Sequence, residues 1–134
     1  ELGLALGSPV FQIYNKLGLN KKFYIVDKII IPQDKFPGMT EEIFKGRANT
    51  IYNLYQNKFN IFITNCSEKL KAISADEKIS KLLNIPSNAP ILKINRVGQT
   101  YNNVTIELRT SYVHTSDIDY IHSQNSTFGE SIWY

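Results

Sequence analysis

The sequence has few of the residues that build crosslinks and metal centres. Its single cysteine, Cys66, excludes a disulfide within the chain and any zinc or iron–sulfur site made from several cysteines. The two histidines, His114 and His122, have no cysteine or carboxylate at the spacing of a metal-binding motif. We therefore expect no metal and no cofactor, Cys66 as a structural residue, and a reducing compartment such as the cytoplasm.

Long apolar runs and a large excess of one charge are also missing. No segment reaches the roughly 18–20 consecutive apolar residues of a membrane span, and the N-terminus lacks the basic flank of a secretory signal. Fifteen basic and twelve acidic residues leave a net charge of +3. That charge is too small and too dispersed along the sequence to predict a nucleic-acid surface. We expect a soluble protein without a membrane partner, and a basic DNA-binding module is disfavoured.

Apolar residues make up 43% of the 134 residues, which is enough for one hydrophobic core. We expect a single domain over 1–134, without internal repeats or an interdomain linker. The chain begins at Glu1 rather than at a methionine, which is typical of a domain excised from a longer protein.

Alternation and turn residues predict strands over 10–19, 23–31, 60–73, 90–97 and 104–113. The first two form a hairpin with a three-residue turn at 20–22. Short helices are predicted after Thr40, after Thr50 and after a capping box at 74–77, in which the side chain of Ser74 is the cap. The order β-β-α-α-β-α-β-β indicates an α+β fold, in which helices pack on one face of an antiparallel sheet.

The last of these strands carries a row of polar side chains. Alternation places Glu107, Arg109 and Ser111 on one face, about 6.6–7 Å apart, and Ile106 and Tyr112 on the other. An acid, a guanidinium and a hydroxyl in line can bind a small polar ligand. The alternative is a solvated sheet face with cross-strand ion pairs, which the pattern alone favours.

A carboxylate also interrupts an apolar row in the first hairpin. Asp27 lies between Ile25 and Ile29, and a three-residue turn would place Asn15 directly opposite it. A buried carboxylate needs a partner. The two side chains form either a hydrogen-bonded core pair or the floor of a ligand pocket.

Other motifs give little indication of chemistry. Arg47 and Thr50 lie at a predicted helix start, where backbone amides favour an anion, although ordinary capping explains them as well. The sequence contains no glycine-rich dinucleotide motif, no phosphate-binding loop and no nucleophile elbow. We therefore do not expect an enzyme.

Taken together, several segments resemble a UTRA domain in order and spacing over about residues 4–120. They are 4–10 (LALGSPV), 26–32 (VDKIIIP), 36–39 (FPGM), 72–77 (AISADE), 82–86 (LLNIP), 89–92 (APIL), 94–97 (INRV) and 104–112 (VTIELRTSY). The resemblance implies the effector-binding half of a GntR transcription regulator of the HutC type. It implies a chorismate lyase-like fold, a homodimer, and an N-terminal winged helix-turn-helix that precedes Glu1 and contacts operator DNA. The stretch 121–134 departs from the family pattern.

The resemblance also bears on the ligand. Family members that bind sugar phosphates carry arginines where Asn15 and Leu17 stand and a glutamate where Asp27 stands, whereas Glu107 and Thr50 match family positions. The loss of both guanidiniums argues against a phosphosugar. With Lys28 and Arg109 present, we expect an anionic effector such as a small carboxylate. The candidate binding residues are Asn15, Asp27, Lys28, Arg47, Thr50, Glu107, Arg109, Ser111 and Tyr112.

Two other functions stay open at this point. A small lyase-type enzyme could use the same fold, because fold does not determine function. A pure dimerisation domain would have no polar pocket around Asp27, Glu107 and Arg109.

Overall fold

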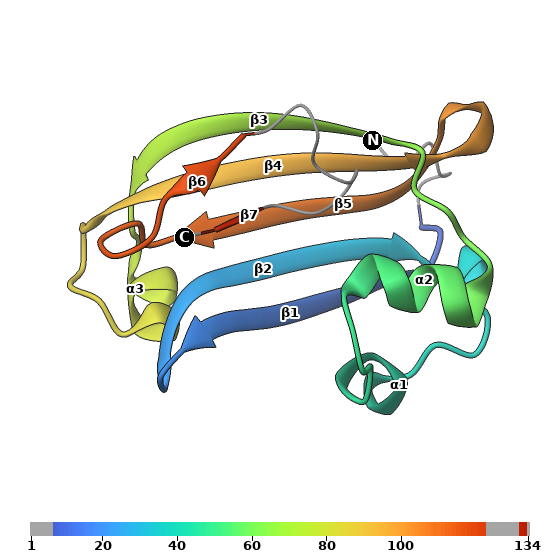
Figure 1. The fold of residues 1–134 in the computed structure, drawn as a ribbon, viewed down its shortest axis with the longest axis horizontal. Coiled ribbons are helices and arrows are strands. Elements are labelled where there is room, and N and C mark those ends of the chain that lie inside the picture. Colours follow the sequence, from blue (N-terminus) through green and yellow to red (C-terminus); the bar gives the residue numbers. More distant parts are fainter. Residues whose placement is uncertain (1–6, 123–131, 134) are drawn as a thin grey trace.

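Five strands form one antiparallel sheet in the computed structural model, which describes residues 7–122 and 132–133 (Figure 1). The strand order is β1-β2-β5-β4-β3, and every neighbouring pair is antiparallel. The strands are β1 (Val10–Leu19), β2 (Lys22–Pro32), β3 (Asn65–Ser74), β4 (Pro90–Thr100) and β5 (Val104–Val113). The helices are α1 (Glu41–Lys45), α2 (Ile51–Phe59) and α3 (Glu77–Leu83), with 3-10 turns at Gln33–Lys35 and Tyr101–Asn103. The predicted α+β class and element order are confirmed.

The β1–β2 hairpin has the predicted register with a different turn. Its loop has two residues, Asn20 and Lys21, both with positive φ, which is the backbone of the tight hairpin turns that fit strand twist. The predicted three-residue loop is therefore wrong. A register shift beside the turn leaves Tyr24 without a partner on β1, and this bulge restores the pairing of Asn15 with Asp27.

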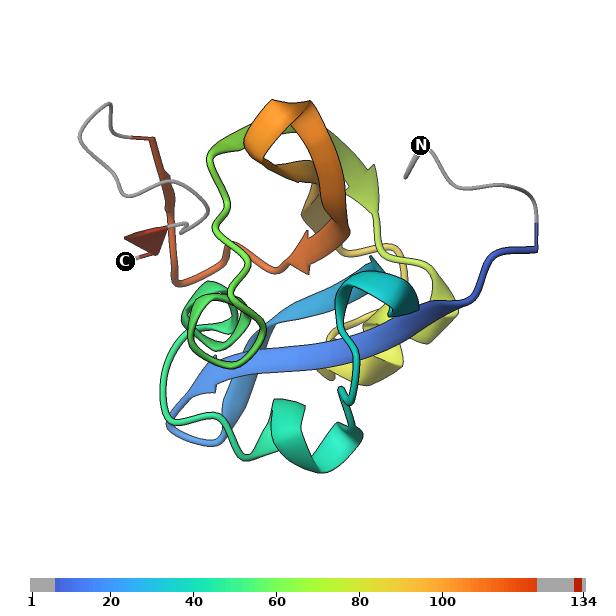
Figure 2. The same ribbon diagram turned by 90° about the vertical axis from the view of Figure 1, so that its right-hand side faces the viewer.

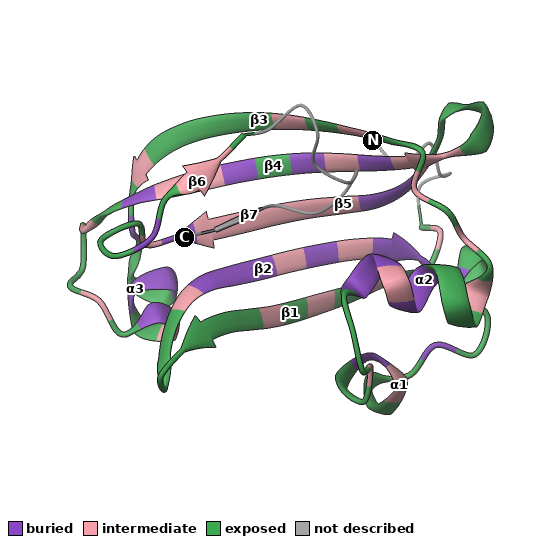
Figure 3. Cartoon of the chain, viewed as in Figure 1, coloured by how far each residue is buried: buried purple, intermediate pink, exposed green. Residues whose placement is uncertain are grey.

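The sheet is covered on both faces, so the prediction that helices pack on one face is wrong. In Figure 2, α2 and α3 lie on opposite sides of the sheet, and α1 lies beyond the edge strand β1. We call these two sides the α2 face and the α3 face. Strand β2 is apolar on both sides and is buried along most of its length (Figure 3). Ile29 and Ile31 pack in the cluster that includes α2, whereas Val26 packs with Ile79 and Leu83 of α3.

A second bulge changes one face assignment in β5. Gly98 pairs with Glu107, and Gln99 pairs with Thr105, which leaves Ile106 without a partner on β4. Ile106 is buried in the α2-face cluster rather than on the opposite side from Glu107. The strict alternation predicted for this strand is wrong at Ile106, because a bulged residue shifts the side-chain order.

The helix caps agree with the sequence at two of three helices. Thr40 and Thr50 accept hydrogen bonds from the backbone amides of Ile43 and Asn53 at 3.1 and 3.2 Å. The cap of α3 is Asp76, which accepts from the Ile79 amide at 2.8 Å. The capping box at Ser74 is wrong by two residues, since β3 continues through that position.

Beyond β5, Tyr120–Ile121 (β6) pairs with Ile132–Trp133 (β7) in a separate two-stranded ribbon. Residues 123–131 and 134 of the predicted tail at 121–134, and the part of the family-like segment before residue 7, lie outside the described residues. In the part of the chain that the structure describes, no helix is long and apolar enough to span a membrane.

Candidate functional site

Glu107 is the centre of a buried polar cluster on the α2 face. Its side chain is fully buried (0% exposed) and receives two hydrogen bonds from Arg109, from Nε to Oε1 at 2.9 Å and from Nη2 to Oε2 at 3.1 Å. The interpretation of this row as a solvated face is therefore wrong. Helix α2 covers the row, so the acid and the guanidinium bind each other away from water.

Two tyrosines of α2 complete the coordination of Glu107. The Tyr52 hydroxyl donates to Oε1 at 3.1 Å, and the Tyr55 hydroxyl donates to Oε2 at 2.5 Å. Burial, and next the negative charge of Glu107, raise the pKa of both phenols well above the usual value. The sequence reading missed these residues, although a spacing of three places both hydroxyls on one face of α2.

A second ion pair lies beside the first. Arg96 of β4 pairs across the sheet with Arg109, and like charges in this position repel unless each has its own partner. Glu68 supplies that partner, because it accepts from Nε and Nη2 of Arg96, both at 2.9 Å. The Tyr52 ring contacts both cations, with its centroid 5.0 Å from the Arg109 guanidinium carbon and 6.0 Å from that of Arg96.

This second pair continues toward β6. The Tyr120 hydroxyl donates to Glu68 Oε1 at 2.6 Å. Burial and the hydrogen bond to Glu68 raise the pKa of Tyr120 to about 12. A continuous polar chain thus extends from α2 through β5, β4 and β3 to β6. No sequence pattern indicated it, because its members come from five separate segments.

The carboxylate in β2 has a different partner from the expected one. Asp27 is 2% exposed and accepts a hydrogen bond from Ser111 Oγ at 2.6 Å. Asn15 lies opposite Asp27 as predicted but directs its Oδ1 toward Arg47 Nη2, at 3.4 Å. Asp27 is thus a hydrogen-bonded core residue, and the polar side chain that borders open space is Asn15.

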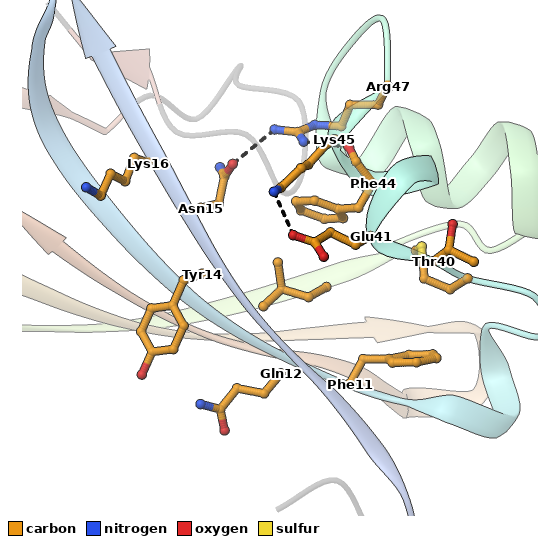
Figure 4. A pocket seen from close by; sticks show the side chains of 12 residues that line it. Phe11, Gln12, Tyr14, Asn15, Lys16, Thr40, Glu41, Phe44, Lys45 and Arg47 are labelled. Atoms are coloured by element: carbon orange, nitrogen blue, oxygen red, sulfur yellow. Dashed lines mark hydrogen bonds and ion pairs between the residues drawn. The ribbon is translucent and has the colours of Figure 1, made fainter. Parts of the chain in front are cut away.

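That space is a cavity of about 500 Å³ between β1 and α1 (Figure 4). Asn15 and Arg47 both line it. Arg47 donates to the Phe44 carbonyl at 2.8 Å and stacks on the Phe44 ring, with 4.5 Å between the guanidinium carbon and the ring centroid. Burial, followed by the nearby charge of Arg109, lowers the pKa of Arg47.

Two buried donors in the wall of the cavity have no partner. Asn15 Nδ2 and Arg47 Nε make no hydrogen bond to any described residue. An unsatisfied buried donor costs about 1–3 kcal/mol, so such groups mark places where a ligand or water binds. Figure 4 shows both side chains at the same end of the cavity, joined by their one hydrogen bond.

The remaining predicted residues lie elsewhere. Arg47 follows the end of α1 and is not at a helix start, so that prediction is wrong, while Thr50 caps α2. Lys28 and Tyr112 lie on the α3 face, because they alternate with Asp27 and Ser111. The structure therefore groups seven of the nine predicted residues on the α2 side: Asn15, Asp27, Arg47, Thr50, Glu107, Arg109 and Ser111. Within residues 7–122, no group of three or more metal-ligating side chains comes together.

Comparison with known proteins gives the family of this chain. The sequence matches the family described as UTRA domain over residues 1–119. The chain therefore belongs to the UTRA domain family and is a regulatory effector-binding domain of the kind found in GntR-family regulators. No curated protein matches the sequence.

Solved structures agree with this result. The ligand-binding domain of a GntR-family transcriptional regulator from Bordetella bronchiseptica has a TM-score of 0.88 and 28% identity, over 92% of this chain and 78% of that one. A GntR-family regulator from Enterococcus faecalis V583 shares the fold at a TM-score of 0.82 and 16% identity, over 92% and 86%. PhnF from Mycobacterium smegmatis shares it at a TM-score of 0.74 and 21% identity, over 85% of this chain and 49% of PhnF.

Proposed function

We propose that this chain is the effector-binding and homodimerisation domain of a HutC-type GntR regulator that acts in the cytoplasm. In the whole protein, an N-terminal winged helix-turn-helix contacts operator DNA. An effector that binds one arrangement of the two DNA-reading domains more tightly than another shifts the population between them. The family match supports this proposal, and the homologous solved domain is described as ligand-binding.

We further propose that the effector is a small carboxylate that binds in the cavity between β1 and α1. The observation that carries this proposal is the pair of buried, unpartnered donors, Asn15 Nδ2 and Arg47 Nε. A carboxylate offers two acceptor oxygens in a plane, which matches the planar donors of a guanidinium. A small rotation of the two side chains into the cavity directs both donors at such a ligand.

The size and charge of the cavity support the same ligand class. A volume of about 500 Å³ lies within the roughly 300–1,000 Å³ of small-molecule sites. Lys16 and Lys45 also line the cavity, although Glu41 neutralises Lys45 through an ion pair of 2.6 Å. Arg109, which the sequence suggested as a ligand contact, is held by Glu107 through two hydrogen bonds, and Lys28 lies on the other face of the sheet. Arg47 takes over the predicted role of the binding cation.

The cluster around Glu107 supports a non-catalytic domain. Both carboxylate oxygens accept from Arg109 and from one tyrosine each, and the side chain is fully buried, so the acid is fully hydrogen-bonded within the protein. A general acid or base must come within hydrogen-bond reach of a substrate. We therefore assign this cluster to structure rather than to the lyase-type alternative.

A thermal-shift screen tests the proposed ligand class. The panel contains acetate, succinate and citrate, with glucose 6-phosphate as the sugar phosphate. We expect at least one carboxylate to raise the melting temperature of the chain, and Arg47→Gln and Asn15→Leu to abolish that rise. Lys58→Gln, which removes an exposed charge from α2, is the control and keeps the response. Stabilisation by glucose 6-phosphate and by no carboxylate would overturn the assignment.

A further inference from the structure

The α3 face of the sheet carries five lysines and no carboxylate. We call this set the lysine face: Lys16, Lys28, Lys69, Lys71 and Lys93. The carboxylates of the five strands, Asp27, Glu68 and Glu107, all lie on the α2 face, where Arg96 and Arg109 neutralise two of them. The sheet therefore separates its charges by side, although the chain as a whole carries only +3.

Cross-strand register places the five lysines in two adjacent rows. One row runs from Lys28 through Thr110 and Asn95 to Lys69. The next row holds the other three, Lys16, Lys93 and Lys71. With strands about 4.7–4.9 Å apart, the rows extend over about 19 Å from β1 to β3. A duplex of that length carries roughly eleven phosphates at one charge per 1.7 Å.

These charges are not neutralised within the described part of the chain. None of the five lysines forms an ion pair there, and Lys16 contacts the Phe23 ring instead. The acids of the neighbouring helix α3 are already engaged, since Asp76 caps the helix and Glu77 pairs with Lys81. Lys78 adds positive charge at the border, where it donates to the Tyr14 hydroxyl at 3.0 Å.

The surface along the row from Lys28 to Lys69 is polar and hollowed, whereas Val26 and Tyr112 of the other row pack with helix α3. A depression of about 330 Å³ is lined by Ser67, Lys69, Asn95 and Thr110, among others. Hydroxyl and amide side chains beside lysines are the groups that contact phosphate oxygens in DNA complexes. Arg96 and Arg109 also line this depression, but Glu68 and Glu107 on the α2 face hold their guanidinium groups.

We propose that the lysine face binds the phosphate backbone of duplex DNA without sequence preference. The choice of DNA as the polyanion rests on the proposed function, because a regulator of this class works next to its operator. The face supplies charge and polar donors but no base-reading element, so it adds affinity and not sequence readout.

Fluorescence anisotropy of a labelled 20-base-pair duplex of random sequence, titrated with this chain, tests the proposal. If all five lysines contact phosphates, the slope of log K against log salt is about −4.5, and affinity falls about 500-fold between 50 and 200 mM salt. For the double variant Lys69→Gln/Lys71→Gln, we expect a slope near −2.7, so that DNA affinity falls about 40-fold over the same salt range. Lys35→Gln/Lys58→Gln removes the same net charge away from this face and is expected to keep the wild-type slope.

Three results would overturn the proposal. The first is no binding to the duplex at 50 mM salt. The second is an equal loss of DNA affinity in both double variants. The third is binding to polyglutamate in place of DNA, which would indicate an acidic protein partner. The assay uses no effector, and its variants at Lys69 and Lys71 lie on β3, away from the cavity between β1 and α1, which Lys16 alone of the five lysines also lines. Its failure therefore leaves the thermal-shift test of the proposed function unaffected.

Discussion

Glu107 shows how one side chain depends on its surroundings. A buried carboxylate is strongly unfavourable without partners, and this one has four donors around two oxygens. Those donors come from β5 and α2, so the acid ties the helix to the sheet. The Glu107–Arg109 pair carries no net charge, and the free-energy cost of burying the carboxylate is offset only while all of its donors are present.

Replacement of the charge in this pair should be strongly destabilising. Glu107→Gln leaves Arg109 buried without a counter-ion, and we expect a loss of about 3–5 kcal/mol in the free energy of unfolding. Urea denaturation measures it. Glu41→Gln, which breaks an exposed pair with Lys45, is the control and should leave the free energy of unfolding nearly unchanged. A loss below about 1 kcal/mol for the first variant would contradict the description of this cluster.

The tyrosines of α2 predict an alkaline limit to stability. Because burial and then Glu107 raise the pKa of Tyr52 and Tyr55 in the folded protein, the unfolded chain releases these protons first as pH rises past about 10. Their contribution is complete below pH 10. Above it, stability declines by up to about 1.4 kcal/mol per pH unit for each tyrosine, until the folded pKa is passed.

Urea unfolding at pH 9, 10 and 11 measures this decline. The double variant Tyr52→Phe/Tyr55→Phe should lose less stability over this range than the wild type, and the exposed Tyr101→Phe should follow the wild type. Equal alkaline slopes in wild type and double variant would show that the two phenols are not held neutral by the fold.

At the scale of single elements, two residues compete as the cap of α3: Ser74 in the sequence prediction and Asp76 in the structure. Asp76→Ala removes the acceptor of the Ile79 amide and should cost about 1 kcal/mol of unfolding free energy. Ser74→Ala, at the end of β3, should leave stability within about 0.5 kcal/mol. Urea denaturation of both variants shows which residue caps α3. A larger loss of stability for Ser74→Ala than for Asp76→Ala would support the capping box predicted from the sequence.

Element order was predictable from the sequence, whereas the details that depend on bulges and on long-range contacts were not. Thr50 and Thr40 mark helix starts through local chemistry. The apolar rows around Asn15 and Asp27 indicate their pairing, but the two-residue turn and the bulge at Tyr24 that produce it were not predicted. The bulge at Ile106 depends on packing against α2, which no local pattern encodes. Arg47 and Asn15 are 32 residues apart, and only the loop after α1 brings them together.

At the scale of the whole molecule, the sheet divides the chemistry between its faces. The α2 face holds paired charges and, at the edge strand β1, the cavity proposed for the effector. The α3 face holds the unpaired lysines. Composition could not show this division, because the net charge of +3 sums fifteen basic and twelve acidic residues without regard to the face on which they lie. Under the two proposals above, a ligand on one side and DNA on the other would act on the same five strands.

The most direct test of the central claim is a ¹H–¹⁵N NMR titration with the carboxylate that stabilises the chain most. The signals to follow are the Nε–H of Arg47 and the side-chain amide of Asn15, assigned with Arg47→Lys and Asn15→Leu. We predict that both shift on saturation, because each donor gains an acceptor. Shifts confined to Lys28 and Tyr112 on the α3 face, with both of these signals unmoved, would contradict an effector site between β1 and α1.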